Sequence, residues 1–248
     1  MFARKPVNKE QLKRKQTLAA AFRIFGKLGL TEGVTGHITV RDPDYPDHFW
    51  LNPLGISYNQ IKVSDLILCS DKGKIVEGKH TKLNHAAFAI HSRIHKHRPD
   101  IIAAAHAHSL YGKIWSTQGR LLDPLSQDAC AFYLDHALYD EYNGIVLDLS
   151  EGDQIAKALG PHKAVILKNH GLITVGASVE TAAWWFISLE RCCQVQVIAE
   201  SLKQAPKPIS HEVALKTQQL AYSGSNSGAL NFQPFLQDII AQHPELLD

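Results

Sequence analysis

Two histidines separated by one residue, His106 and His108, end a short apolar run of the sequence, IIAAA. In an extended strand, side chains two residues apart point to the same face, so both imidazoles can reach one cation. A third histidine, His170, follows the apolar run AVILK and precedes Gly171, and a glycine allows a sharp turn. Three neutral imidazoles delivered from strand ends are typical of a catalytic divalent metal site that leaves positions open for water or substrate.

The spacing alone does not prove a metal site. A single histidine at a strand end is more often a hydrogen-bonded structural residue than a ligand, and His-x-His pairs also arise by chance. The remote His170 strengthens the pair only if the fold brings it close. The metal hypothesis therefore depends on the tertiary structure.

The rest of the pattern predicts the elements that must position these histidines. Helical spacing of apolar residues predicts helices at 12–28, 82–96, 111–118, 152–159 and 179–201. Runs of β-branched and aromatic residues predict a hairpin of 37–41 with 49–52, another of 66–70 with 74–76, and strands before His106, at 144–148 and at 164–167. Short strands interleaved with helices indicate an α/β domain.

The domain organisation follows from the same pattern. We expect an N-terminal arm at residues 1–8, one domain at 9–205, and a C-terminal extension at 206–248 that packs on the domain or on a neighbouring subunit. Pro206 and Pro208 mark the second boundary.

Composition narrows the function classes. The 248 residues are 45% hydrophobic and 20% charged, which suits one soluble domain and excludes a coiled coil or a disordered tail. A formal charge of +2 does not indicate a nucleic-acid partner. No apolar window is long enough for a membrane span, and the charged N-terminus lacks the apolar segment of a secretory signal. The four cysteines show no CxxC spacing and are expected to be reduced, so we expect a cytoplasmic protein that binds neither nucleic acid nor membrane.

Several motifs occur together in a fixed order. They are GVTGHITVR, the DKGKIVEG hairpin, RPD at 98–100, HAHS at 106–109, and KNHGL at 168–172 followed by a long helix with tryptophans. In this combination the chain resembles the class II aldolase and adducin head-domain family over roughly residues 12–202. The resemblance implies a three-layer α/β/α sandwich with a central, mostly antiparallel sheet. It also implies a homotetramer with active sites between subunits and a divalent metal on the three histidines, with zinc as the first expectation and Fe(II) or Mn as alternatives.

One departure from the family concerns a carboxylate. In the sugar-phosphate aldolases and epimerases that the chain resembles, a glutamate four residues before the histidine of an H-x-x-I-[YH] segment binds the metal and carries a proton. Counting back from His91 of HSRIH gives Ala87, whose methyl group can do neither. The usual retro-aldol route is therefore closed. An alignment shifted by two residues would instead put His85 there as a fourth ligand.

A second departure concerns the phosphate anchor. Family members that bind a sugar phosphate surround it with Thr, Asn and Ser side chains and a glycine, because a dianion needs donors. The corresponding positions here are Val34, His37, Leu54, His85 and Ala86, with Gly55 retained. This favours an unphosphorylated carboxylate or aromatic acid. We assign substrate binding to His37, Asn52, Gly55, His85 and Gln127. The alternative is that His37 and Asn52 only satisfy backbone groups of the hairpin.

The segment 125–144 is the expected source of a proton donor. Related aldolases contribute a tyrosine from about this region to the active site of a neighbouring subunit. His136 falls nearest that position, with Tyr133 and Tyr139 as alternatives, and a histidine can donate a proton near neutral pH. His91 completes the predicted catalytic set, although the tyrosines could equally serve as interface aromatics.

Three functions remain in competition. The first is a metal-dependent lyase, of aldolase or decarboxylase type, that acts on a small unphosphorylated oxo or hydroxy acid. The second is a non-haem Fe(II) oxygenase that acts on an aromatic oxo-acid. The third is a non-catalytic adducin-like scaffold or cytoskeleton-binding module, for which two imidazoles on one strand face would have no use.

Overall fold

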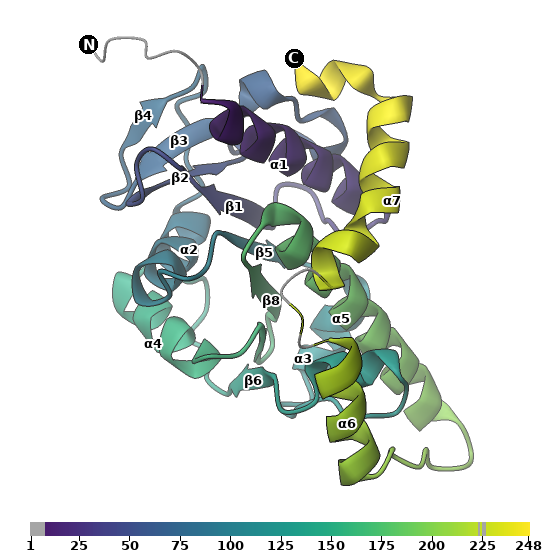
Figure 1. Ribbon diagram of the computed structural model, residues 1–248. Coiled ribbons are helices and arrows are strands. Elements are labelled where there is room, and N and C mark those ends of the chain that lie inside the picture. Colours follow the sequence, from purple (N-terminus) through teal and green to yellow (C-terminus); the bar gives the residue numbers. More distant parts are fainter. Residues whose placement is uncertain (1–7, 223, 225–226) are drawn as a thin grey trace.

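The computed structural model describes residues 8–222, 224 and 227–248 (Figure 1). Its strands are β1 (His37–Arg41), β2 (His48–Leu51), β3 (Ile67–Ser70), β4 (Ile75–Glu77), β5 (Ala103–Ala107), β6 (His136–Tyr139), β7 (Ala164–Leu167) and β8 (Gly171–Gly176). Its helices are α1 (Lys9–Lys27), α2 (His85–His97), α3 (Leu110–Ser116), α4 (Leu149–Leu159), α5 (Val179–Ser201), α6 (His211–Ala221) and α7 (Ser227–Gln242). None of these helices is long and apolar enough to cross a membrane.

The eight strands form one sheet in the order β4-β3-β2-β1-β5-β8-β7-β6. Every neighbouring pair is antiparallel except β6 and β7, which are parallel. Helices α2 and α4 pack together over one face, and α1, α5 and α7 cover the other (Figure 1). The fold is the expected three-layer α/β/α sandwich with a mostly antiparallel sheet.

Alternation along β5 divides the core between the two faces. Ala103, Ala105 and Ala107 belong to the cluster under α1 and α5, whereas Ala104 belongs to the cluster under α2 and α4. Since successive side chains of a strand point to opposite faces, His106 shares the face of Ala104. The sheet therefore turns His106 toward the α2 side.

The structure corrects one predicted strand. Residues 144–148 form no strand and lead into α4, whereas β6 comes earlier, at His136–Tyr139. Of the apolar residues that suggested a strand, Ile145 and Leu147 are 78% and 64% exposed, whereas Val146 is buried in the cluster under α2 and α4. Their apolar character does not reflect a place in the sheet. Strand β8, which begins at Gly171, was not predicted at all.

The C-terminal residues form α6 and α7, which the sequence pattern did not predict. Helix α7 packs on α1 and α5 and buries Phe232 completely in their cluster. Helix α6 contacts the short helical turn at Asp128–Phe132. The arm predicted at residues 1–8 lies outside the described residues except for Asn8, whose side chain accepts from the backbone N–H of Glu10 and caps α1.

Candidate metal centre

The end of β5 and the turn between β7 and β8 bring the three histidines together. His106 is the fourth residue of β5 and pairs with Ile173 of β8, and His108 follows the strand. His170 lies in the tight turn before β8. Gly171 has φ +147°, in the region that favours glycine, and a Cβ there would lie 3.8 Å from His106 Cε1. The turn therefore places His170 directly beside the end of β5.

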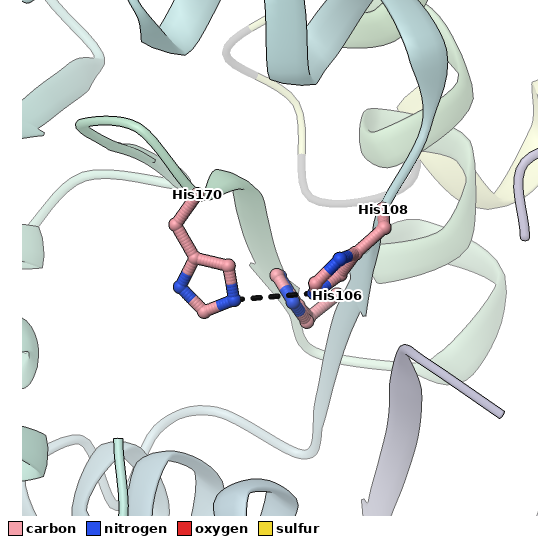
Figure 2. Close-up of side chains that lie close together, drawn as sticks. All are labelled: His106, His108 and His170. Carbon is pink, nitrogen blue, oxygen red and sulfur yellow. Dashed lines mark hydrogen bonds between the residues drawn. The ribbon is translucent and has the colours of Figure 1, made fainter. Parts of the chain in front are cut away.

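The three rings face one another closely enough to share one ion. Their candidate ligand atoms all lie within 4.8 Å of one another, and the Nε2 atoms of His108 and His170 are 3.2 Å apart (Figure 2). The ring centroids are separated by 4.7 to 5.1 Å. Among the residues that the structure describes, this is the one such group, and it contains no carboxylate.

The hydrogen bonding of His106 fits a metal ligand. Its Nδ1–H donates to the carbonyl oxygen of Leu172 at 2.8 Å, which leaves a lone pair on Nε2. That Nε2 atom is buried and has no hydrogen-bond partner. A ligating histidine commonly donates its other ring N–H to a backbone carbonyl in this way. A divalent cation bound among the three imidazoles would provide the missing partner for His106 Nε2.

Burial keeps the three imidazoles neutral. It lowers the pKa of His106 well below its ordinary value, with a further contribution from neighbouring imidazoles. The pKa of His170 falls to about 4, mainly through burial, and that of His108 is lowered for the same reason. Since only the neutral ring binds a metal, the site is ready to hold a cation at neutral pH.

A buried carboxylate holds the chain just after His108. Glu190 of α5 is 4% exposed and accepts from Ser109 Oγ at 2.5 Å and from the backbone N–H groups of Tyr111 and Gly112 at 2.9 and 2.6 Å. It thereby satisfies donors at the start of α3 that have no partner within the helix. Glu190 is buried because α3 packs its N-terminus on α5.

Replacing Glu190 by alanine is expected to destabilise the protein by about 3 kcal/mol, because several buried donors would lose a charged acceptor. Urea unfolding followed by circular dichroism measures this change. Arg191→Ala, at the exposed neighbouring position, is the matched control and should change stability by less than about 0.5 kcal/mol. Equal effects of the two substitutions would contradict the capping role.

Two further predicted residues lie beside the centre. The ring of His37 packs against that of His106, with centroids 4.8 Å apart, because the two residues are partners across β1 and β5. His91 of α2 is fully buried and lies 2.8 Å from His37, measured between Nε2 and Nδ1. His91 is thus linked to the centre through His37.

Three other predicted binding residues, Asn52, Gly55 and His85, lie after β2 and at the start of α2. Asn52 is buried and its Oδ1 has no partner. Gly55 has φ +97° and open space where a Cβ would stand. His85 is the exposed first residue of α2. Ala87, at the position of the family glutamate, packs its methyl group among the side chains of β2 and β3. Substrate binding by Asn52, Gly55 and His85 stays a prediction.

Among the predicted proton donors, Tyr139 at the end of β6 lines a small cavity together with His170, whereas His136 lies at the start of β6. His136 pairs with Ala164 at the start of β7, whereas His170 follows the opposite end of that strand. Both ring nitrogens of His136 are engaged: Nδ1 donates to the Phe132 carbonyl oxygen at 2.6 Å, and Nε2 accepts from the Leu122 N–H at 2.9 Å. A catalytic role for His136 at a neighbouring chain's centre stays a prediction.

Tyr133 and Gln127 are the two remaining predicted residues, the first partly buried and the second exposed. The hydroxyl of Tyr133 lies 2.8 Å from Nδ1 of His211 in α6. Their predicted roles in catalysis and binding are likewise untested.

The sequence reasoning missed several residues around the centre. Thr39 and His95 belong to one hydrogen-bonded group with His91: Thr39 Oγ1 lies 2.7 Å from His91 Nδ1 and 2.9 Å from His95 Nε2. Glu141 and Tyr142 line a small cavity together with His170. The signals for Thr39 and His95 were present, since Thr39 lies two residues after His37 in a strand and His95 lies one helical turn after His91.

Comparisons with known proteins agree with the geometry. The family described as Class II Aldolase and Adducin N-terminal domain matches residues 16–197. The chain is 45% identical over 232 residues to a 4-hydroxy-3-prenylphenylpyruvate oxygenase/4-hydroxy-3-prenylbenzoate synthase from Streptomyces roseochromogenus subsp. oscitans, covering 92% of this chain and 82% of that protein. It is 44% identical to Decarboxylase NovR of Streptomyces niveus over 92% of this chain and 84% of that protein.

A solved structure is similar over nearly the whole length. The L-fuculose 1-phosphate aldolase from Glaciozyma antarctica PI12 matches with a TM-score of 0.89 and 39% identity, covering 98% of this chain and 96% of that one. The similarity to the family therefore covers the whole fold and not only the sequence motifs. This chain therefore belongs to the class II aldolase and adducin N-terminal domain family.

Proposed function

We propose that this chain is a metal-dependent lyase that breaks a carbon–carbon bond beside the carboxylate of a small, unphosphorylated oxo or hydroxy acid. The observation that carries the proposal is the all-imidazole centre. His106, His108 and His170 lie within ligand distance of one another, and the position of the family's glutamate is filled by the buried methyl group of Ala87.

The donor set suits a borderline divalent cation. His106, His108 and His170 would hold it, and neutral imidazole is a common ligand of zinc and of Fe(II). When bound, the cation would supply Lewis-acid stabilisation of negative charge that develops on a substrate oxygen. We take zinc as the native metal and a homotetramer as the working form, as the family resemblance implies, and the cytoplasm as the location, as the unpaired cysteine spacing suggests.

The absence of a carboxylate at Ala87 favours loss of carbon dioxide over retro-aldol cleavage. A retro-aldol reaction begins with removal of a proton from a hydroxyl group, which needs a base. In decarboxylation of an acid with a carbonyl group at carbon 3, the bond between carbons 1 and 2 breaks, and its electron pair forms a double bond between carbons 2 and 3 while the carbonyl electrons move onto the carbonyl oxygen, which gives an enolate. Carbon dioxide leaves, and a proton is taken up by carbon afterwards. No base is needed to start.

A second candidate is an oxygenase in which the same histidines hold Fe(II). The specific observation that favours it is the 45% identity to a protein named as an oxygenase of a phenylpyruvate. The substrate would then be an aromatic 2-oxo acid, and dioxygen would be the oxidant. The scaffold alternative has less support, because relatives similar over most of their length carry enzyme names.

The test begins with protein purified without chelator, whose metal content is measured. Three substrates are then compared: an acid with a carbonyl at carbon 3 and a hydroxyl at carbon 2, an aryl pyruvate, and L-fuculose 1-phosphate. Release of carbon dioxide from the first without oxygen uptake supports the lyase. Oxygen uptake with the aryl pyruvate and iron in the protein supports the oxygenase. Cleavage of the sugar phosphate alone would overturn both.

A further inference from the structure

Helix α3 touches all three chain segments that carry the candidate ligands. It spans Leu110–Ser116, and its N-cap, Ser109, directly follows His108. The helix also packs on α5 and on β7 and β8, the two strands that flank the turn of His170. The position of α3 therefore bears on the positions of all three imidazoles.

The contact with the segment of His106 runs through Leu172 of β8. The carbonyl oxygen of Leu172 accepts from Nδ1–H of His106 at 2.8 Å. The side chain of the same leucine lies against Gly112 of α3, where a Cβ atom would stand 2.7 Å from Leu172 Cδ1 and 2.9 Å from Ser109 Oγ. With any larger residue at this position, the leucine or the helix would have to move. Glycine thus lets α3 pack closely on the strand that orients His106.

The contact with the segment of His170 is a backbone hydrogen bond at the other end of α3. The carbonyl oxygen of Ser116, the last residue of the helix, accepts from the N–H of Asn169 at 3.2 Å. Asn169 directly precedes His170 and has φ +59°, a left-handed conformation that residues with a side chain adopt at a cost. Such a conformation persists where the surrounding structure supports it. The C-terminus of α3 provides that support for the turn that carries His170.

Glu190 of α5 anchors the other end of the helix. Its buried carboxylate accepts from the Ser109 hydroxyl and from the backbone N–H groups of Tyr111 and Gly112. These three donors lie within the first turn after the His108 segment. Because α3 has only about two turns, a shift of its N-terminus would also move the contacts that support the other two ligand segments.

We propose that α3 positions the three ligand segments of the metal centre, and that Glu190 is the positioning residue that fixes α3 on α5. Glu190 acts through the backbone of the helix and through the contacts at Gly112 and Ser116, whereas the three histidines bind the cation. The inference rests on the proposed function only for the bound cation, because the contacts of α3 are present in the chain without metal. Loss of the anchor should loosen the turn of His170 and weaken metal binding.

Hydrogen exchange on the full-length, metal-free protein tests the positioning role without metal or turnover. Glu190→Gln keeps the shape, but its amide nitrogen cannot accept, so at least one of the three hydrogen bonds is lost. Mass spectrometry should show exchange about 5-fold faster in the peptide that contains residues 168–172, the factor expected for loss of one hydrogen bond. Glu190 reaches this peptide through α3.

The matched control for exchange is Ile239→Ala. Ile239 is a buried residue of α7, 2% exposed, and the substitution lowers the stability of the domain by leaving a cavity. It should not selectively speed exchange at residues 168–172. Unchanged exchange there in Glu190→Gln, or an equal increase in both variants, would contradict the proposal.

Zinc binding tests the consequence for the centre. The dissociation constant for Zn²⁺ is measured by competition with a chromophoric chelator, on protein stripped of metal. Glu190→Gln and Gly112→Ala should each bind zinc about 10-fold more weakly, the lower end of the range for partners that orient metal ligands. Alanine favours a helix more than glycine does, so a loss of affinity in Gly112→Ala would not reflect a weaker helix. Ile239→Ala should keep the affinity within about 2-fold, as expected for a distant site.

Each outcome of the zinc measurement has one reading. Unchanged affinity in both α3 variants, or an equal loss in Ile239→Ala, would overturn the proposal, and Gly112→Ala decides if Glu190→Gln does not fold. A chain that binds zinc as expected but reacts with none of the acids would contradict the proposed function alone. If the unmodified chain bound no zinc, the metal centre would be wrong, and hydrogen exchange would still decide whether α3 and Glu190 hold the turn of His170.

Discussion

Replacing His106 by alanine is expected to abolish metal retention and to reduce turnover at least about 1000-fold, since Lewis-acid stabilisation is worth several kcal/mol. His106 supplies the one ligand atom that is buried without a partner, so no other group can take its place. His170→Ala is expected to have the same effect on metal retention and turnover. Because His170 lies in a partly exposed turn, loss of its ring should destabilise the fold less than loss of the buried ring of His106. Metal content per chain and turnover are the two measurements.

The matched control is His97→Ala. His97 is an exposed histidine of α2 whose Nε2 meets the Asp153 carboxylate at 2.6 Å, away from the three ligands. It should keep the metal and the activity of the unmodified protein. Circular dichroism of each variant checks that the fold is retained. Full metal content and turnover in both ligand variants would remove the basis for the metal centre.

The metal-free protein is expected to unfold cooperatively as the pH falls from about 6 to 5. Five histidines have pKa values that burial holds far below 6.5: His37, His91, His95, His106 and His170. In the unfolded chain each returns to a pKa of about 6.5. The unfolded state therefore binds protons that the folded state excludes.

The sign of the effect follows from this difference. The contribution of the neutral rings to the free energy of unfolding is fully present above about pH 6.5. It decreases as the pH falls below the pKa that histidine has in the unfolded chain. The decrease ends where the rings of the folded protein themselves become protonated, which for His170 is near pH 4. At pH 5.5 each buried neutral ring lowers the free energy of unfolding by about 1.4 kcal/mol, and the five together lower it by about 7 kcal/mol. This is comparable to the whole free energy of unfolding of a typical domain, about 5–15 kcal/mol.

Circular dichroism against pH measures the transition, with and without added divalent cation. The cation should move the midpoint to lower pH, because it binds only the neutral rings of the folded state. Its failure to protect the fold would argue against the three-histidine site. An unfolding transition confined to pH below 4, where carboxylates titrate, would contradict the buried neutral histidines.

The sequence predicts the three candidate ligands because their signals are local. The period of two places His106 and His108 on one face, and the glycine after His170 indicates a turn. Their convergence depends on the pairing of β5 with β8, and β8 was not recognised from the sequence. The family resemblance supplied what the local pattern could not, namely the three layers and the antiparallel sheet.

The parts that sequence reasoning missed depend on tertiary packing. Thr39 resembles any threonine of a hairpin, and His95 resembles any histidine near a helix end, until α2 packs on β1 and joins them through His91. Glu190 beside Arg191 has the pattern of a solvated helix face, and only the N-terminus of α3 turns its carboxylate into a buried cap. The false strand at 144–148 was predicted from three adjacent apolar residues, but in the fold Ile145 and Leu147 remain exposed and Val146 is buried outside the sheet.

X-ray absorption at the metal edge of the purified protein tests the shared centre most directly. The account predicts one divalent cation per chain with three imidazole nitrogens at about 2.0–2.1 Å if the metal is zinc, the remaining scatterers being light atoms of water or substrate. A metal with sulfur ligands, or with fewer than three imidazoles, would contradict the account.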